Sequence, residues 1–154
     1  MENENRIIGY IENGIVIDHI PVGKAWKIVE LLGIGKKREG RVSLGDGYES
    51  EKMGKKGVLK IEGASLSEYE LNLIALVAKN TVVSIITDGK IQKKIKAEIP
   101  EILKEIVLCP NLNCISNDSH EKVESFIHYS SEKEFCCHYC AREFGEDDLK
   151  LRDY

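Results

Sequence analysis

Hydrophobic residues in the first hundred positions follow two different periods along the chain. Stretches rich in Ile and Val are typical of short strands, whereas apolar residues three and four positions apart indicate helices. Asn13-Gly14 and Asp88-Gly89 predict tight turns, and Ser67 with Glu70 forms a capping box at the start of a helix. The pattern predicts strands over 6–11, 14–20, 41–45, 57–61, 81–87 and 90–95, helices over 24–32 and 67–78, and a charged loop over 46–56.

The order of these elements indicates the fold class. From Gly14 onward the predicted order is strand, helix, strand, strand, helix, strand. This order is typical of a ferredoxin-like sandwich, an α+β fold that combines an antiparallel sheet with two helices. Nearly every apolar residue in this part of the chain is therefore interpreted as core.

Charge and cysteine divide the chain near Pro100. Residues 1–100 contain no cysteine and carry a net charge of +2, whereas residues 101–154 contain all five cysteines and carry a net charge of −6. We therefore expect two domains, 1–100 and 101–154, the second being small and rich in β-structure. A segment of about fifty residues buries too little apolar surface to be stable without a staple such as a metal ion.

The cysteines of the second domain include two closely spaced pairs. Cys109 and Cys114 form C-x4-C, and Cys137 and Cys140 form C-x2-C. Two such pairs suit the tetrahedral coordination of Zn²⁺, so we predict one structural zinc ion held by these four residues. A site closed by four thiolates has no position for water or substrate, which argues against catalytic zinc. A disulfide or redox pair and inert core thiols are the alternatives.

Cys136 is the remaining thiol. Its use as a ligand would give C-x3-C with Cys140, a less common spacing, so we interpret Cys136 as a buried strand residue. His138 lies between the last two cysteines and could replace a thiolate, although four cysteines already complete the site. His120 and His128 are interpreted as surface or interface residues.

Charged residues in the first domain are candidates for anion binding. Lys60 stands in an otherwise apolar strand, so its amine must either reach solvent or meet an anion. Asp18 and His19 are neighbours in a strand and are expected to point to opposite faces rather than to form an acid–base dyad. His19, Lys60 and Lys94 could together surround a polyphosphate. The sequence has no Gly-rich phosphate loop and no nucleophile elbow, so catalysis is not expected.

Composition narrows the function classes further. Hydrophobic residues make up 42% and charged residues 31% of the chain, a balance typical of globular proteins. No stretch approaches the ~20 apolar residues that span a bilayer, and the polar start MENENRIIGY is unlike a secretory signal. The net charge of −4 disfavours general nucleic-acid binding. We therefore expect a cytoplasmic protein that binds neither membranes nor nucleic acid.

Four segments resemble the regulatory chains of aspartate carbamoyltransferase. They are Gly-Ile-Val-Ile-Asp-His-Ile-Pro at 14–21, Met-Gly-Lys-Lys at 53–56, Leu-Lys-Ile-Glu at 59–62 and Cys-Pro-Asn-Leu-Asn-Cys-Ile at 109–115. Their order and the cysteine spacing agree with that family along nearly the whole chain. The resemblance implies a non-catalytic subunit of pyrimidine biosynthesis. Such a subunit binds CTP, ATP and UTP in its first domain and alters the activity of a separate catalytic chain, on which its zinc domain docks.

The same resemblance implies the residues of the nucleotide pocket and of the metal site. Asp18 would lie near the ribose, His19 near phosphate, Lys60 by the base and ribose, and Lys94 by the triphosphate. The implied pocket consists of Ile8, Gly9, Tyr10, Ile11, Asp18, His19, Lys60, Ser84, Ile86, Gly89, Ile91 and Lys94. The implied zinc ligands are Cys109, Cys114, Cys137 and Cys140, the four that the spacing already indicates.

The resemblance also implies an assembly, and it leaves two rivals. First domains pair into a regulatory dimer, and these dimers join catalytic trimers in a dodecamer of six catalytic and six regulatory chains. Ser84 stands where the family often has asparagine, and Gly89 where it often has tyrosine. One rival is a nucleic-acid-binding zinc ribbon, which the acidic second domain disfavours. The other is a small enzyme using Asp18 and His19, for which the sequence offers no nucleophile or cofactor motif.

Overall fold

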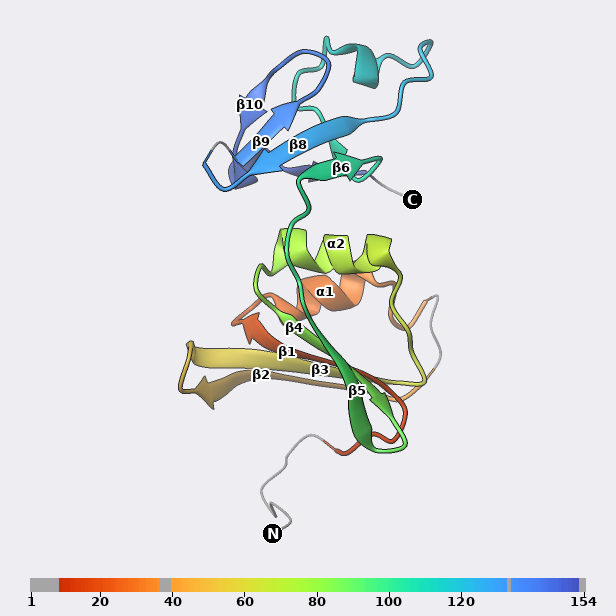
Figure 1. Ribbon diagram of the computed structural model, residues 1–154, viewed down its shortest axis with the longest axis vertical. Helices are drawn as coiled ribbons and strands as arrows, with labels where there is room; N and C mark the ends of the chain where they lie inside the picture. The colour runs from red at the N-terminus through yellow and green to blue at the C-terminus, as the bar shows by residue number, and fades with distance from the viewer. Residues whose placement is uncertain (1–8, 37–39, 133, 153–154) are drawn as a thin grey trace. The chain divides into compact units, whose positions relative to one another are not determined.

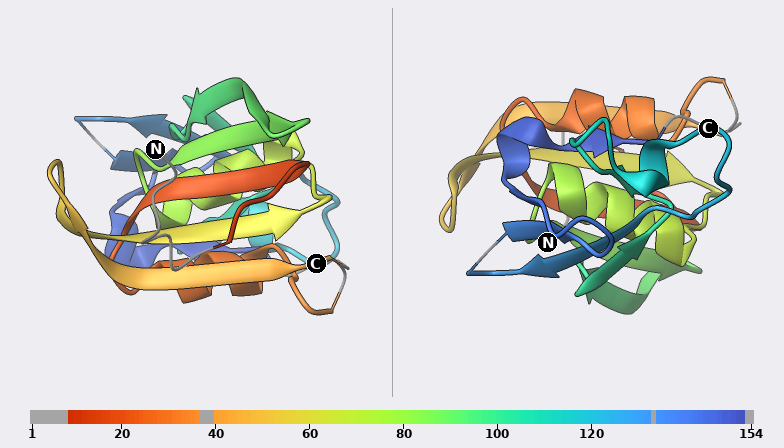
Figure 2. Two further views of the ribbon diagram at one scale, coloured as in Figure 1. Left: turned by 90° about the horizontal axis from the view of Figure 1, so that it is seen from below. Right: turned by 90° about the horizontal axis from the view of Figure 1, so that it is seen from above.

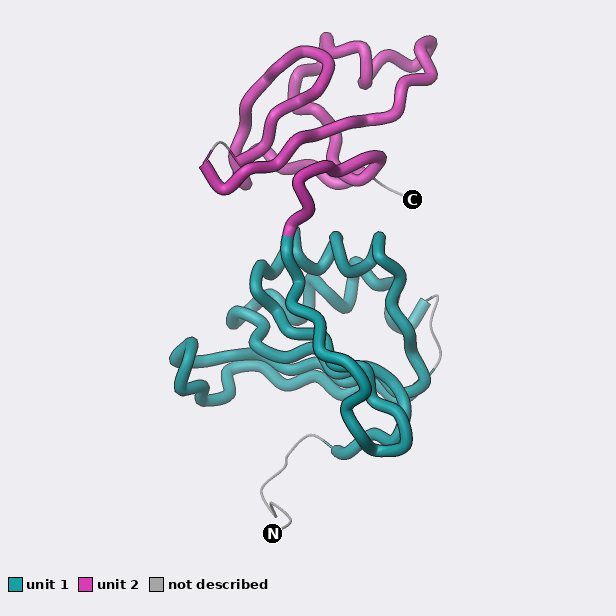
Figure 3. Tube along the Cα trace, in the orientation of Figure 1, with its two compact units in different colours: residues 1–98 teal, residues 99–154 magenta. Residues whose placement is uncertain are grey.

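The chain divides into two compact units, residues 1–98 and 99–154 (Figure 3). A computed structural model describes residues 9–36, 40–132 and 134–152. None of the helices in these ranges is both long and apolar enough to cross a membrane.

Unit 1 is a five-stranded antiparallel sheet with two helices on one face (Figures 1 and 2). The strand order β2-β3-β1-β4-β5 places the first four strands as in a ferredoxin-like sandwich, and β5 extends the sheet beside β4. The predicted fold class is therefore confirmed. The elements are β1 (Gly14–Pro21), α1 (Ala25–Leu31), β2 (Val42–Ser50), β3 (Gly54–Glu62), α2 (Glu68–Val77), β4 (Val82–Thr87) and β5 (Lys90–Lys96).

The core of unit 1 fills the space between the sheet and the helices. Alternate strand residues such as Ile15, Ile17 and Leu59 are buried there, together with Ile28 of α1 and Ile74 of α2. The predicted capping box begins α2, because Ser67 accepts from the backbone N–H of Glu70 and the Glu70 side chain accepts from that of Ser67. Since successive strand residues point to opposite faces, the residues between the core positions line the face that the helices leave open.

Two predicted elements of unit 1 differ from the structure. The charged stretch 46–56 is not a loop, because β2 and β3 extend through it to a short turn at 51–53. The charges of β2 are compatible with a strand because β2 is an edge strand, whose side chains and outer backbone groups meet water. In the inner strand β3, the charge of Lys56 is paired with Asp18. The strand predicted over 6–11 is absent from its described part, 9–11, and residues 6–8 lie outside the described ranges. Segment 9–11 is instead held by side chains, as described below.

Unit 2 consists of short strands around a small apolar core. A four-stranded sheet has the order β10-β9-β8-β6, and β11 pairs with β7. The side chains of Leu103, Ile127 and Phe135 are fully buried at its centre. The elements are β6 (Ile102–Lys104), β7 (Val107–Leu108), η1 (Ile115–Asn117), β8 (Phe126–Ser130), β9 (Glu134–Cys137), β10 (Glu143–Phe144), η2 (Glu146–Asp148) and β11 (Lys150–Leu151).

Candidate functional site

The strand register aligns four residues in one row across the open face of the unit 1 sheet. Val16 of β1 lies opposite Lys60 of β3 on one side and Ser84 of β4 on the other, and Ser84 lies opposite Lys94 of β5. Two lysines from opposite sides of the sheet therefore flank its centre. Because β-sheet pairing brings them together from distant parts of the sequence, neither lysine could be placed from its local pattern alone.

A cleft of about 740 Å³ lies over this row. On one side of the row the register pairs Ile86 with Ile91, which makes this end of the cleft apolar. On the other side of the row lie Asp18 and Lys56, which pair with each other and make the other end polar. The lining residues are Tyr10, Ile11, Val16, Asp18, Tyr48, Glu49, Lys56, Val58, Lys60, Ser84, Ile86, Gly89, Ile91 and Lys94. The apolar end suits a flat apolar group, and Lys60 and Lys94 of the central row suit an anionic group beside it.

The structure gathers nine of the twelve residues implied for the nucleotide pocket along this cleft. Of the other three, Gly9 accepts a hydrogen bond from the Lys60 amine through its carbonyl oxygen at 3.1 Å. His19 lies beside Asp18 and is outside the described lining, and Ile8 lies outside the described residues.

Five lining residues were not among the predicted ones. Lys56 and Val58 alternate with Lys60 on the same face of β3, so a period of two from Lys60 could have found them. Val16 lies beside Lys60 only through the pairing of β1 with β3. Tyr48 and Glu49 were assigned to the loop that the structure replaces with β2.

The apolar end of the cleft is bounded by segment 9–13 and the turn at Asp88-Gly89. The Tyr10 hydroxyl donates to the carbonyl oxygen of Gly89 at 2.8 Å, and the Gly89 N–H donates to the carbonyl oxygen of Glu12 at 2.9 Å. The side-chain oxygen of Asn13 accepts from the N–H of Asp88 at 3.2 Å. These bonds hold a segment without strand pairing at a defined position over the sheet.

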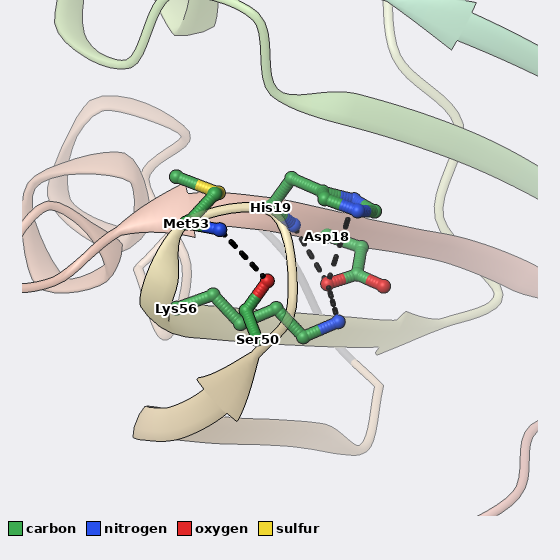
Figure 4. A network of polar contacts seen from close by, with 5 residues as sticks. All are labelled: Asp18, His19, Ser50, Met53 and Lys56. Atoms are coloured by element: carbon green, nitrogen blue, oxygen red, sulfur yellow. Dashed lines mark hydrogen bonds and ion pairs between the residues drawn. The ribbon is translucent and has the colours of Figure 1, made fainter.

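Asp18 and His19 contact each other, contrary to the expectation that they point to opposite faces (Figure 4). The register of β1 against β3 shifts between Ile17 and Ile20, and His19 has a φ of 59°. This bulge breaks the strand alternation, so the backbone N–H of His19 donates to the Asp18 carboxylate at 2.6 Å. The Lys56 amine lies 2.8 Å from the same carboxylate oxygen.

Replacing Asp18 with asparagine is expected to remove a pH-dependent part of the stability, about 1 kcal/mol or less. Burial acts to raise the pKa of Asp18, but the hydrogen bonds from Lys56 and the His19 backbone outweigh it and lower the pKa from 3.8. The contribution is therefore present above 3.8 and is lost as the pH falls through the lower pKa of the folded chain. Urea unfolding of the two proteins near neutral pH and in acid measures this difference.

An unchanged pH dependence of stability in Asp18→Asn would contradict this prediction. If the stability of the variant changes with pH as that of the wild-type chain does, the Asp18–Lys56 pair contributes nothing to folding. Glu49→Gln is a suitable control, because Glu49 also lines the cleft. We expect this variant to keep the acid sensitivity that Asp18 supplies.

In unit 2, four cysteines meet at one point. The sulfur atoms of Cys109, Cys114, Cys137 and Cys140 all lie within 4.8 Å of one another. The distances are 3.6 Å between Cys109 and Cys140 and 3.7 Å between Cys114 and Cys137. A tetrahedral zinc site with bonds of about 2.3 Å separates its sulfur atoms by about 3.8 Å, so the four thiols have the spacing of such a site.

The pKa values of the clustered thiols are shifted in both directions. Burial raises the pKa of the Cys109 thiol and that of the Cys137 thiol. Burial acts in the same direction on the exposed Cys140, but hydrogen bonds from the Arg142 backbone, Asn111 and neighbouring thiols lower its pKa to about 7. Cys109 and Cys137 therefore resist ionisation unless a cation balances their charge, whereas Cys140 ionises more readily.

Hydrogen bonds around the four cysteines fix the loop that carries the first pair. The Ser116 hydroxyl donates to the Cys114 sulfur at 3.1 Å. The Asn117 side-chain amide donates to the carbonyl oxygens of Cys109 at 2.9 Å and Asn111 at 2.8 Å. Such bonds orient metal ligands and restrict the loop between them.

The other cysteine and histidine candidates lie outside this cluster. Cys136 is half-buried rather than buried as predicted, because it lies on the face of β9 opposite the buried residues Phe135 and Cys137. His138 is exposed, and its ring nitrogen lies 3.0 Å from that of His128. All five cysteines are free thiols rather than disulfides.

Comparison with known proteins places both units in one family. Residues 6–98 match the family model of the aspartate carbamoyltransferase regulatory chain, allosteric domain, and residues 101–150 match the model of its metal binding domain. The chain is 43% identical over 148 residues to the aspartate carbamoyltransferase regulatory chain of Thermococcus kodakarensis, covering 95% of this chain and 96% of that one.

Two further relatives carry the same description. The protein from Pyrococcus abyssi is 41% identical over 143 residues, covering 92% of this chain and 94% of the relative. That from Methanopyrus kandleri is 42% identical over 142 residues, covering 91% and 90%. The chain therefore belongs to the family of aspartate carbamoyltransferase regulatory chains, which have an allosteric and a metal-binding domain and leave catalysis to a separate catalytic chain.

Proposed function

We propose that residues 1–100 form a domain that binds CTP, ATP and UTP, and that residues 101–154 hold one structural zinc ion and dock on the catalytic chain. The observation that carries this proposal is the cleft in unit 1, in which Lys60 and Lys94 flank a surface with an apolar end. A nucleoside triphosphate has two parts that complement these features, a flat base for the apolar end and a polyanion for the lysines.

The polarity of the cleft favours one orientation of the nucleotide. The next row of the sheet, where Gly14 pairs with Ile86 and Ile86 pairs with Ile91, is apolar and would contact the base. Lys94 and Lys60 would then meet the phosphates and the ribose, because lysine amines bind phosphate as mobile point charges. Tyr10 and Ile11 line the cleft, so their backbone N–H and C=O groups could bond to the edge of the base.

The four cysteine thiolates fit zinc better than a hard cation. Thiolates are soft ligands, and a tetrahedral four-sulfur set is typical of structural zinc. Since the site is closed by protein ligands, the role of the ion is to hold the loops that carry Cys109, Cys114, Cys137 and Cys140 together. Cysteines that serve as metal ligands rather than as disulfides are typical of a reducing compartment, and we place the chain in the cytoplasm.

The loops of the metal site also present apolar side chains to the outside. Leu112, Ile115 and Tyr139 are 86%, 48% and 41% exposed, although all three lie between or next to the clustered cysteines. Apolar side chains held outward on a metal-stapled loop are typical of an interaction surface. We assign this surface to the catalytic chain, within a complex of six catalytic and six regulatory chains in which the first domains pair.

Regulation then follows from linkage between the two units. A nucleotide can shift the enzyme between two states only if it binds one state more tightly than the other. We expect CTP to favour the low-activity state and ATP the high-activity state. The regulatory chain would contribute no atom to the chemical step.

Calorimetric titration of the zinc-loaded full chain with CTP, ATP and tripolyphosphate tests the proposal. We expect saturable binding of CTP and ATP at one shared site, so that each displaces the other. Tripolyphosphate should compete with both more weakly, because it lacks the base. If neither nucleotide binds the chain, alone or assembled with the catalytic chain, unit 1 is not a nucleotide sensor.

A further inference from the structure

Tyr10 is restrained in a way that its own packing does not explain. Its hydroxyl group is bonded to the Gly89 carbonyl oxygen at 2.8 Å, yet the residue is 58% exposed. Fixing an aromatic ring costs conformational entropy, which burial of the ring usually offsets. Here the exposed ring stands at the apolar end of the cleft, near Ile91, which is itself 56% exposed.

Gly89 leaves room for the Tyr10 ring because it has no side chain. Its φ is +74°, and a Cβ atom at this position would lie 1.9 Å from the Tyr10 hydroxyl oxygen and 3.1 Å from the ring carbon that carries it. Any side chain at position 89 would therefore displace the phenol. The turn is tied to the same segment by the bond from the Gly89 N–H to Glu12 and by the bond from Asp88 to Asn13.

We propose that Tyr10 is a specificity-determining residue whose ring stacks on the nucleobase, and that Gly89 is required because the Tyr10 phenol occupies the place of a side chain. This inference rests on the proposed nucleotide function and assigns the apolar end of the cleft to recognition of the base. Every base has a π-face, so stacking accepts both purines and pyrimidines. A purine overlaps the ring over a larger area and gains more from it.

The test compares Tyr10→Ala and Tyr10→Phe with the wild-type chain by calorimetric titration with ATP, CTP and tripolyphosphate. Tyr10→Ala should weaken ATP binding by roughly tenfold or more, because stacking on an aromatic ring is a substantial part of base binding. CTP binding should weaken by a smaller factor and tripolyphosphate binding should not change. Tyr10→Phe keeps the ring but loses the bond to Gly89, so its losses should be smaller than those of Tyr10→Ala.

Gly89→Ala provides an independent arm that leaves Tyr10 in the chain. The added methyl group should displace the phenol. As in Tyr10→Ala, ATP binding should weaken more than CTP binding. Gly23→Ala is the matched control, because Gly23 also has a positive φ, of +84°, but a Cβ there meets nothing within 4 Å and the residue lies outside the described cleft lining. It should bind all three ligands as the wild-type chain does.

Each remaining outcome decides against the inference. If the wild-type chain binds ATP and CTP and Tyr10→Ala binds them within twofold of it, Tyr10 does not contact the base and the inference fails alone. An equal loss for tripolyphosphate would mean that Tyr10 acts through the fold of the cleft, which also overturns it. If the wild-type chain binds neither nucleotide, both this inference and the proposed function fail.

Discussion

Replacing Cys114 with alanine is expected to unfold unit 2 and to abolish assembly with the catalytic chain. A metal ion bound by the four clustered sulfur atoms would cross-link a unit whose strands are only two to five residues long. Binding of structural zinc is worth on the order of 10–16 kcal/mol in small modules, more than a core of this size can supply. Zinc content, circular dichroism and sedimentation with the catalytic chain measure the three consequences.

Cys136→Ala is the matched control for this experiment. Cys136 lies on the same strand as Cys137, but its thiol is outside the cluster. We expect this variant to bind its metal ion and to assemble normally. If Cys114→Ala assembles as well as Cys136→Ala does, the metal site is not needed for docking.

The Cys114 variant also tests whether the two units are independent. Unit 1 has its own core, so we expect Cys114→Ala to retain nucleotide binding while it loses assembly. Loss of both would mean that the folding of unit 1 depends on unit 2.

Replacing Lys94 with alanine is expected to weaken CTP and ATP binding by roughly 10- to 100-fold, because a hydrogen bond to a charged group contributes about 1.5–3 kcal/mol. Lys94 lies opposite Ser84 on the face of the sheet that carries the cleft. The loss should be as large for tripolyphosphate, which has the phosphates but no base. Higher salt should weaken ligand binding by the wild-type chain more than binding by the variant, since salt screens the attraction between Lys94 and the phosphates.

Lys93→Ala is a control of the same charge one residue away. Lys93 pairs with Ile85, on the opposite face of β5 from Lys94, and is outside the cleft lining among the described residues. Equal losses in the two variants would mean that only the overall charge of the β5 surface matters. A normal response of Lys94→Ala would remove Lys94 from the site.

Lys60→Ala should weaken the binding of the same ligands and leave assembly with the catalytic chain intact. Its amine bonds to the Gly9 carbonyl oxygen, so part of the loss would come from release of segment 9–11. Comparison with Lys94→Ala separates this structural part from the direct contact with phosphate.

Local signals in the sequence account for most of the elements. The capping box at Ser67 and Glu70, the Asp88-Gly89 turn and the cysteine pairs each depend on residues within a few positions of one another. Such features form wherever the chain folds, so a single sequence is enough to predict them. The extended hairpin over 46–56 was missed because charged residues disfavour a buried strand but not an exposed edge.

What the sequence by itself determined is therefore the α+β class, the position of the cysteine module and the four cysteines that meet there. Only the tertiary structure decided that Lys60, Val16, Ser84 and Lys94 stand in one row, because strand register is a long-range property. It also decided that the bulge at His19 turns the His19 N–H onto Asp18. The contact of Tyr10 with Gly89 joins residues 79 positions apart, and no local pattern encodes a contact of that kind.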